Sequence, residues 1–394
     1  MPGPSETVAA TEIGAAPDGS PFIADPAVLR GRRTLKWRVG DEPDRLCLGV
    51  AEMDTATPAF LRDALTRAVA LGETGYGLCA EQEAACRRYL REHHGAAVAA
   101  VRCTTDVLAG LRTVLASELP PRSPVIVETP VYGDLFTVVR EAGLTPLAVP
   151  LARGADGYRH DWAALEAAAA AGARAWILCQ PHNPVGRAWT GDEQAAAVSL
   201  VRRHDLLLLA NEVHLPLGLD QQPPSAYADA GIDRARAFGF TSASKAFNVA
   251  GLKSATLYAS ERTAETLTGM PQGLLGRPGS LGSLATVACY EHGVPWLTGL
   301  RAELAARVAQ VRTELSELPL AVDVLAPDAT YLVWAEFPRA GEAERFAEAL
   351  RTASVHVLPG GVFGGERFAH CFRINAAAHP AVLDEAFTRI RAAL

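Results

Sequence analysis

Apolar residues recur every three to four positions in many segments between residues 60 and 290, which is the spacing of amphipathic helices. On this pattern we expect helices at residues 60–71, 83–92, 107–115, 135–142, 162–171, 193–203 and 281–290. Short apolar runs between them are typical of buried strands, at residues 125–127, 175–179, 206–210 and 237–241. Strands that alternate with helices predict an α/β fold whose large domain holds a mainly parallel, doubly wound sheet.

The pattern changes after residue 295. There we expect a helix at 295–318, a strand at 331–337, a helix at 342–350, a strand at 355–358 and a helix at 380–392. This order predicts a smaller α+β domain. We therefore divide the chain into a disordered arm at 1–25, an N-terminal segment at 26–60 that packs with the small domain, a large domain at 61–295 and a small C-terminal domain at 296–394.

Composition narrows the classes of function. The 394 residues are 49% hydrophobic and 21% charged, as in a globular protein, and the net charge of −7 does not favour a nucleic-acid partner. No apolar stretch reaches the roughly 18 residues of a membrane span, and the first residues do not resemble a signal peptide, so we expect a cytoplasmic protein. The seven cysteines form no C-x-x-C pair, so neither a disulfide framework nor a metal site is predicted.

Lysine is rare in this chain. Lysine and arginine together number 37, but only Lys36, Lys245 and Lys253 are lysines. Arginine stays protonated and cannot act as an amine nucleophile, so a lysine retained against such a bias is a candidate for amine chemistry.

Three polar loops each follow a predicted buried strand, at residues 180–186, 211–214 and 241–248. The carboxyl ends of parallel strands share one edge of a sheet, and ligands bind there. We therefore expect Asn183, Asn211 and Lys245 to face the same crevice.

Together these loops resemble the fold-type I enzymes that use pyridoxal 5′-phosphate (PLP), the aspartate aminotransferase superfamily of class I and II. Within it, the chain is similar to the MalY/PatB branch of carbon–sulfur β-lyases. The motifs that carry the resemblance are Lys36-Trp37, residues 50–58, Gly75-Tyr-Gly77, Thr129-Pro-Val-Tyr132, residues 244–248, Gly293-Val-Pro-Trp296, residues 329–334 and Phe372-Arg-Ile-Asn375.

The resemblance implies how the cofactor is held. Lys245 would bond covalently to the cofactor aldehyde and later move the substrate proton. Ser242, Ser244 and Lys253 would bind the 5′-phosphate. The N-terminus of a helix that begins near Val107 and Leu108 would point free N–H groups at the same phosphate, with Asp106 as its N-cap.

Further roles follow from the same resemblance. Tyr132 would lie against the pyridine ring, unless it is an ordinary core tyrosine. Asn183 would donate to the ring O3′ and line the substrate site. Arg373 would bind the substrate α-carboxylate as a fork, unless it forms a surface ion pair, and the backbone near Ala51 would close the other side. Tyr76 would come from the neighbouring subunit, which implies a homodimer with shared active sites.

Position 211 departs from the family, which has an aspartate there to pair with the protonated ring nitrogen. Asn211 is neutral and cannot raise the pKa of that nitrogen as a carboxylate does, so a carbanion at the substrate Cα should be less stable. One interpretation is that a second group compensates for the missing carboxylate, or that the enzyme is merely slower. The other is that its chemistry is specialised and does not require a long-lived carbanion. His214, three residues later, should lie near the ring or its O3′, in a structural or a functional role.

The function expected is β-elimination from an S-substituted L-cysteine, with Lys245, Tyr132 and Asn211 as catalytic residues. Alternatives are decarboxylating oxidative deamination of an S-conjugated cysteine, as in PLP enzymes of lincosamide antibiotic pathways, and amino transfer. A non-catalytic, ligand-binding descendant is a further alternative, which the joint presence of Lys245, Tyr132, Asn183 and Arg373 disfavours.

Overall fold

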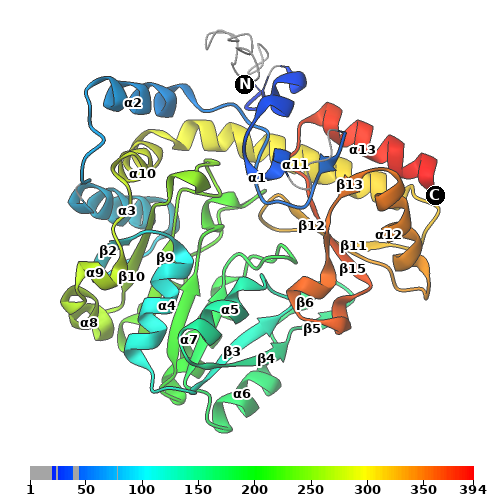
Figure 1. The fold of residues 1–394 in the computed structure, drawn as a ribbon. Coiled ribbons are helices and arrows are strands. Elements are labelled where there is room, and N and C mark those ends of the chain that lie inside the picture. The colour runs from blue at the N-terminus through cyan, green and yellow to red at the C-terminus, as the bar shows by residue number, and fades with distance from the viewer. Residues whose placement is uncertain (1–19, 24, 39–43, 78) are drawn as a thin grey trace.

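The computed structural model of the protein describes residues 20–23, 25–38, 44–77 and 79–394. Its main feature is a sheet of seven strands in the order β2-β10-β9-β8-β7-β3-β4, in which β10 is antiparallel to both neighbours and the other strands are parallel (Figure 1). The strands are β2 (Ala100–Thr104), β3 (Pro124–Thr129), β4 (Thr145–Pro150), β7 (Ala175–Cys179), β8 (Leu207–Asn211), β9 (Arg236–Thr241) and β10 (Ala255–Ala259). The predicted α/β fold is confirmed.

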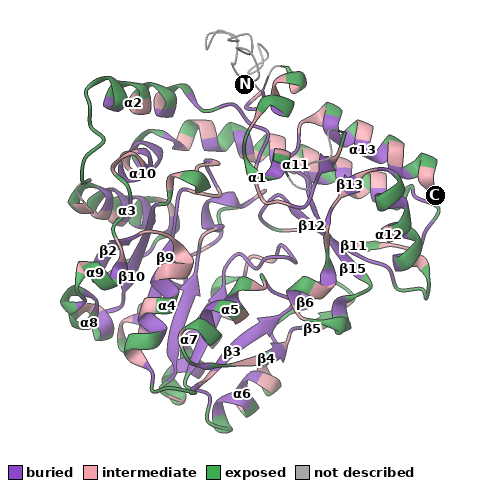
Figure 2. Cartoon of the chain, viewed as in Figure 1, coloured by how far each residue is buried: buried purple, intermediate pink, exposed green. Residues whose placement is uncertain are grey.

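Side chains of the central strands alternate between two cores, because successive residues of a strand point to opposite faces. In β8, Leu207 and Leu209 pack on one face and Leu208 and Ala210 on the other. The strands are buried on both faces, which explains their continuous apolar runs (Figure 2).

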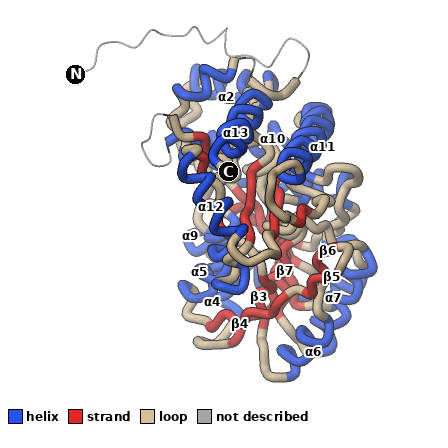
Figure 3. Tube along the Cα trace, turned by 90° about the vertical axis from the view of Figure 1, so that its right-hand side faces the viewer, coloured by secondary structure: helices blue, strands red, loops and turns tan. Residues whose placement is uncertain are grey.

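Helices cover both faces, with α4 and α5 on one side of the strands and α6 and α7 on the other (Figure 3). The first face packs on α4 (Val107–Glu118), α5 (Asp134–Glu141) and α8 (Ala264–Gly269). The second packs on α2 (Ala59–Ala70), α3 (Cys79–His94), α6 (Trp162–Ala170), α7 (Gly191–Arg203) and α10 (Ser280–His292). Short elements complete this part: α9 (Gln272–Leu275), β5 (Ala152–Gly154) and β6 (Gly157–Arg159). Helix α1 (Leu35–Arg38) instead packs Trp37 against the C-terminal core.

The C-terminal part holds an antiparallel sheet in the order β11-β12-β15-β14. Its elements are α11 (Val294–Ser316), β11 (Asp323–Val324), β12 (Leu332–Glu336), α12 (Glu342–Thr352), β14 (Leu358–Pro359), β15 (Cys371–Asn375) and α13 (Pro380–Ala393). Helix α11 joins the two parts, because its first half, with Leu297 and Leu304, packs in the large core and its second half, with Val308 and Leu315, packs in the C-terminal core.

Two expectations need correction. The strand expected at 355–358 is divided between β13 (Val355–His356), which pairs in parallel with β1 (Leu46–Cys47), and β14, which pairs with β15. The disordered arm expected at 1–25 falls mostly outside the described residues, but Phe22 and Ile23 are buried, and Phe22 pairs with Thr55. Apolar side chains thus anchor this end of the arm. The proposed domain boundaries stay a prediction.

Candidate active site

The carboxyl ends of β7, β8 and β9 lie side by side, because these strands are parallel neighbours in the sheet. Their register places Cys179 opposite Asn211, and Asn211 opposite Phe240. The loops that leave these ends contain Asn183 and Lys245, so the structure brings the three predicted loops to one edge, as expected.

Lys245 is half-buried in the loop after β9, and its Nζ donates a hydrogen bond to the main-chain oxygen of Ala51 at 3.1 Å. Burial lowers the pKa of Lys245 to about 8, and the positive charge of Arg373 contributes, while Glu52 opposes the shift. A lysine amine with such a pKa is partly neutral near pH 8 and can act as a nucleophile.

Arg373 on β15 is buried, with 3% of its surface exposed. Its partners are neutral, since Nη1 donates to Asn183 Oδ1 at 3.1 Å and Nη2 to Gly49 O at 2.8 Å, while Nε is buried without a partner. Burial lowers the pKa of Arg373 to about 10. A buried guanidinium that lacks a carboxylate is suited to receive one from a ligand, and the alternative of a surface ion pair is ruled out.

The main chain of residues 49–54 forms one wall of this site, and two amide side chains hold it. Asn248 accepts from Met53 N at 2.9 Å and donates to Met53 O at 2.8 Å. Asn375 donates to the oxygens of Val50 and Glu52, both at 2.7 Å. Both asparagines lie in motifs that the sequence singled out, but no role was predicted for either.

A buried ion pair supports the same segment from behind. Lys36 Nζ lies 2.9 Å from Asp54 Oδ2, and both side chains are almost completely buried. Asp54 also accepts from Trp37 Nε1 at 3.0 Å and from His379 N at 3.0 Å. Lys36 is therefore a structural cation, not a second amine nucleophile.

The predicted phosphate-binding residues gather at the start of α4. Asp106 is its N-cap, as expected, and accepts from Ala109 N at 2.8 Å, while its other oxygen lies 3.3 Å from Lys253 Nζ. Within the described residues, the N–H groups of Val107 and Leu108 have no protein acceptor. These N–H groups and the Lys253 ammonium form a set of donors that suits a phosphate.

Ser242 and Ser244 lie at the end of β9, with their hydroxyl oxygens 2.7 Å apart. Ser242 donates to the main-chain oxygen of Ser254 at 2.6 Å. The antiparallel pairing of β9 with β10 brings this end of β9 to the start of β10, next to Lys253. The serine pair and Lys253 therefore lie at the same edge of the sheet.

Asn211 is the last residue of β8 and is buried, with Oδ1 accepting from Val213 N at 3.4 Å. His214 is buried as well, its Nδ1 lacks a partner, and its ring lies edge-on to that of Tyr331 at 6.5 Å. Burial, together with the charges of Lys245 and Arg373, lowers the pKa of His214 to about 3, so its imidazole is neutral. Tyr331, to which no role was assigned, donates to Ala51 O at 3.1 Å.

Tyr132 follows β3, and its backbone N–H donates to Asn183 O at 3.1 Å. With 36% of its surface exposed it is not an ordinary core tyrosine. Its hydroxyl donates to Asp134, and burial, followed by that carboxylate, raises the pKa of Tyr132. The Tyr132 backbone therefore lies beside Asn183, and the role of its partly exposed ring against a planar ligand stays a prediction.

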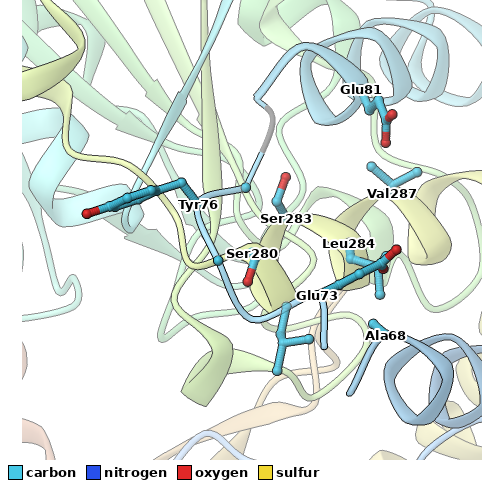
Figure 4. A pocket seen from close by; sticks show the side chains of 11 residues that line it. Ala68, Glu73, Tyr76, Glu81, Ser280, Ser283, Leu284 and Val287 are labelled. Atoms are coloured by element: carbon cyan, nitrogen blue, oxygen red, sulfur yellow. The ribbon is translucent and has the colours of Figure 1, made fainter. Parts of the chain in front are cut away.

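Tyr76 lies apart from these residues, with 96% of its surface exposed. It lines a cavity of about 410 Å³ with Glu73, Glu81 and Ser280, and its ring extends away from those three side chains (Figure 4). Within one chain the structure therefore does not bring Tyr76 to the other site residues, and its role across a subunit interface stays a prediction.

The protein has a doubly wound α/β fold in which a lysine of lowered pKa, a buried arginine and Asn183 come together near the carboxyl ends of the strands. The chain belongs to the aminotransferase class I and II family, whose model matches residues 45–390. The predicted family is confirmed, and with it the predicted cofactor, because this family is PLP-dependent.

Individual relatives agree with this assignment. A putative cystathionine beta-lyase of Mycobacterium tuberculosis is 33% identical and covers 93% of this chain, which covers 96% of that protein. The cystathionine beta-lyase PatB of Bacillus subtilis is 29% identical, with 92% and 97% covered. The crystal structure of a putative PLP-dependent beta-cystathionase from Corynebacterium diphtheriae is 27% identical and superposes with a TM-score of 0.86, with 94% and 97% covered.

The residues present fit the cofactor. A phosphate needs donors, and the free N–H groups at α4, the Ser244 hydroxyl and Lys253 supply them, whereas the Ser242 hydroxyl already donates to Ser254 O. An aldehyde needs a neutral amine, and Lys245 can supply one.

None of the helices in the described part of the chain is long and apolar enough to span a membrane.

Proposed function

We propose that the protein is a cytoplasmic carbon–sulfur β-lyase that converts an S-substituted L-cysteine and water into pyruvate, ammonia and a thiol. The observation that carries this proposal is Arg373, which is buried and donates only to uncharged acceptors, near a lysine whose pKa is lowered. The relatives that bear the name cystathionine beta-lyase support the class of reaction.

Arg373 would bind the substrate α-carboxylate, because its Nε is buried without an acceptor and a charged ligand would satisfy it. Asn183 already accepts from Arg373 through Oδ1, which leaves its Nδ2 to donate to the ring O3′. The backbone at Ala51, whose oxygen accepts from Lys245 and Tyr331, would close the other side of the carboxylate site. The substrate would thereby be oriented at two points before any bond changes.

Lys245 would hold pyridoxal phosphate, which would supply an electron sink that acidifies the substrate Cα proton and so prepares the Cβ–S bond for cleavage. The Nζ of Lys245 would take the proton from Cα. Tyr132 would exclude water from one face of the ring. His214, neutral because of burial, would lie near O3′ without adding a charge there.

We propose a homodimer with shared active sites, in which Tyr76 reaches the phosphate of the neighbouring subunit. Tyr76 is 96% exposed, as are 56% of Val69 and 63% of Leu71 a few residues earlier, and exposed large apolar side chains of this kind suit a subunit interface. Mixing inactive Lys245→Ala and Tyr76→Ala subunits tests this, because each mixed dimer would regain one complete site. At equal amounts, about a quarter of the wild-type activity should return, whereas unshared sites would restore none.

Asn211 sets the finer chemistry. Its Oδ1 accepts from Val213 N, so the group left to face the ring nitrogen is the amide NH₂, a donor. A donor favours an unprotonated ring nitrogen, which is a weaker electron sink than a pyridinium. Elimination of a good sulfur leaving group tolerates a weaker sink better than amino transfer does. Asn211→Asp should strengthen the long-wavelength absorbance seen with substrate and shift the products; an unchanged spectrum and product ratio would contradict specialised chemistry.

Product analysis separates the reactions. The holoenzyme is incubated with L-cystathionine, S-alkyl cysteines and larger thiol conjugates, with and without oxygen. Equal amounts of pyruvate, ammonia and thiol support the lyase, and Lys245→Ala should abolish all three. Transfer of the amino group to an added keto acid would favour an aminotransferase. Oxygen consumption with carbon dioxide release would instead favour decarboxylating oxidative deamination, which the weaker sink at Asn211 keeps as a second candidate.

A further inference from the structure

Two cysteines and a glutamate that are distant from the catalytic lysine in sequence meet at the start of α3. Cys79 is the first residue of this helix, Glu83 follows one turn later, and Cys103 lies on β2 opposite them. The two Sγ atoms and a carboxylate oxygen all lie within 4.8 Å of one another. Cys103 is buried, whereas Cys79 and Glu83 are partly exposed, so the cluster opens to solvent on one side.

The contacts within the cluster fix its geometry. Cys103 N donates to Glu83 Oε1 at 3.1 Å, and Cys103 Sγ approaches the main-chain oxygen of Cys79 at 3.5 Å. Residues four apart on a helix lie on the same face, so Cys79 and Glu83 both face the strand. The three side chains therefore converge because the helix and the strand hold them there.

We propose that Cys79, Glu83 and Cys103 bind a divalent, thiophilic metal ion of the zinc type. Tetrahedral zinc with bonds of about 2.3 Å to sulfur and 2.0–2.2 Å to oxygen places its ligand atoms about 3.6–3.8 Å apart. Only a small contraction of the present cluster is needed to reach that spacing. Two thiolates and one carboxylate leave the fourth position to water on the solvent side.

The surrounding charges suit such an ion. Two thiolates and a carboxylate carry three negative charges, of which a divalent ion neutralises two. The remaining negative charge faces Arg102, whose Nε lies 4.0 Å from Glu83 Oε1. Arg102 is itself fixed by the oxygens of Thr268, Met270 and Gln272, at 2.9–3.2 Å. This arginine is held in place to balance the site.

The metal would join two segments that lead to the active site. Cys79 follows shortly after the loop with Tyr76, and Cys103 precedes the start of α4, where the free N–H groups lie. A bound ion would fix the position of one segment relative to the other. The site is therefore a structural link and lies outside the catalytic cluster.

Metal binding by the untagged holoenzyme tests the proposal, with Zn²⁺ measured by equilibrium dialysis and elemental analysis, and Co²⁺ followed by its tetrahedral ligand-field bands in the red. The wild type should bind one ion per chain and unfold at a higher temperature with Zn²⁺ than without. Cys79→Ser should lose the ion, and Glu83→Gln should weaken binding at least by the roughly 10- to 100-fold that outer-shell partners cost.

Cys86→Ser is the matched control, because Cys86 lies on the same helix but in the large core, and it should bind the ion as the wild type does. Cys79 is partly exposed, so its serine variant should fold, and its unfolding temperature without metal verifies this. Equal binding by the wild type and Cys79→Ser would overturn the proposal. A Cys79–Cys103 disulfide in freshly purified protein would overturn it too, because oxidised sulfurs cannot bind the ion.

Discussion

The ε-amine of Lys245 donates to the main-chain oxygen of Ala51, 194 positions earlier in the sequence, at 3.1 Å. A carbonyl oxygen accepts a hydrogen bond without adding a full negative charge, so it positions the amine while leaving its pKa to burial and to Arg373. The amine is thus kept ready for covalent attachment of the cofactor.

The rate at which the apoenzyme attaches PLP should rise with pH, with a midpoint near 8. Only the neutral amine attacks the aldehyde, and the pKa of Lys245 is lowered to about 8. Arg373→Gln removes a positive charge and should move the midpoint up, whereas Glu52→Gln removes the opposing charge and should move it down. Stopped-flow absorbance measures both. Arg203→Gln, at an exposed site, is the control, and shifts of the same sign in the two variants would contradict this account.

Substrate recognition should depend on the carboxylate through Arg373. Arg373→Gln should lower kcat/KM for an S-substituted cysteine by about 10- to 100-fold, because hydrogen bonds to charged groups contribute roughly 1.5–3 kcal/mol. The corresponding carboxamide substrate offers no charge, so its kcat/KM should change much less. Steady-state kinetics with the two substrates gives the ratio. An equal loss for both would show that the variant perturbs the site in general.

Much of the fold could be predicted because burial on two faces leaves a clear pattern. The β7 strand was placed at its observed bounds, Ala175–Cys179, because all five residues are buried. Three strands of the same sheet were missed. Strands β2 and β10 are largely buried but contain polar residues such as Arg102 and Thr256. Strand β4, Thr145–Pro150, lies at the sheet edge, has one buried residue and contains two prolines, so it shows neither an apolar run nor a clean alternation.

The sequence predicted the residues of the candidate site that have a proposed role toward cofactor or substrate. It did not predict the side chains that position the main chain by hydrogen bonds. Lys245, Asn183 and Arg373 belong to motifs with a chemical meaning, and the fold brings them together. The hydrogen bond from the Asn375 side chain to Val50 O joins residues 325 positions apart, and its acceptor is a main-chain oxygen that any residue type would supply. Local sequence carries no signal for such a contact.

Lys36→Met should destabilise the protein by roughly 3–5 kcal/mol, because it leaves Asp54 as a buried charge without its cation. Urea denaturation of the holoenzyme measures the loss. Arg391→Met is the matched control: it breaks a partly exposed pair with Glu314 and should cost at most about 1 kcal/mol. The double variant Lys36→Met, Asp54→Asn should recover part of the stability. Similar losses for Lys36→Met and Arg391→Met would show that the buried pair contributes no more than a surface one.

Glu212, next to Asn211, points away from the site into a buried network. It accepts from Ser225 Oγ at 2.8 Å, from Ala226 N at 2.7 Å and from the Tyr258 hydroxyl. Burial nevertheless raises the pKa of Glu212 to about 7, because three donors do not replace full hydration of a carboxylate. In the unfolded chain this residue titrates near its ordinary value of 4.5.

This difference gives stability a pH dependence of known sign. Between pH 4.5 and 7 the unfolded chain releases the proton while the folded protein retains it, so rising pH favours unfolding. Relative to Glu212→Gln, which does not titrate, the wild type should lose on the order of 3 kcal/mol over that interval and then level off. Urea denaturation at several pH values measures the difference. Glu166→Gln is the contrast: the hydrogen bond with His204 lowers the pKa of Glu166, so the wild type should gain stability relative to this variant only as pH rises towards 4.5, and the difference should stay level from 4.5 to 7. A flat difference for Glu212→Gln would mean that the three donors hold the carboxylate ionised throughout.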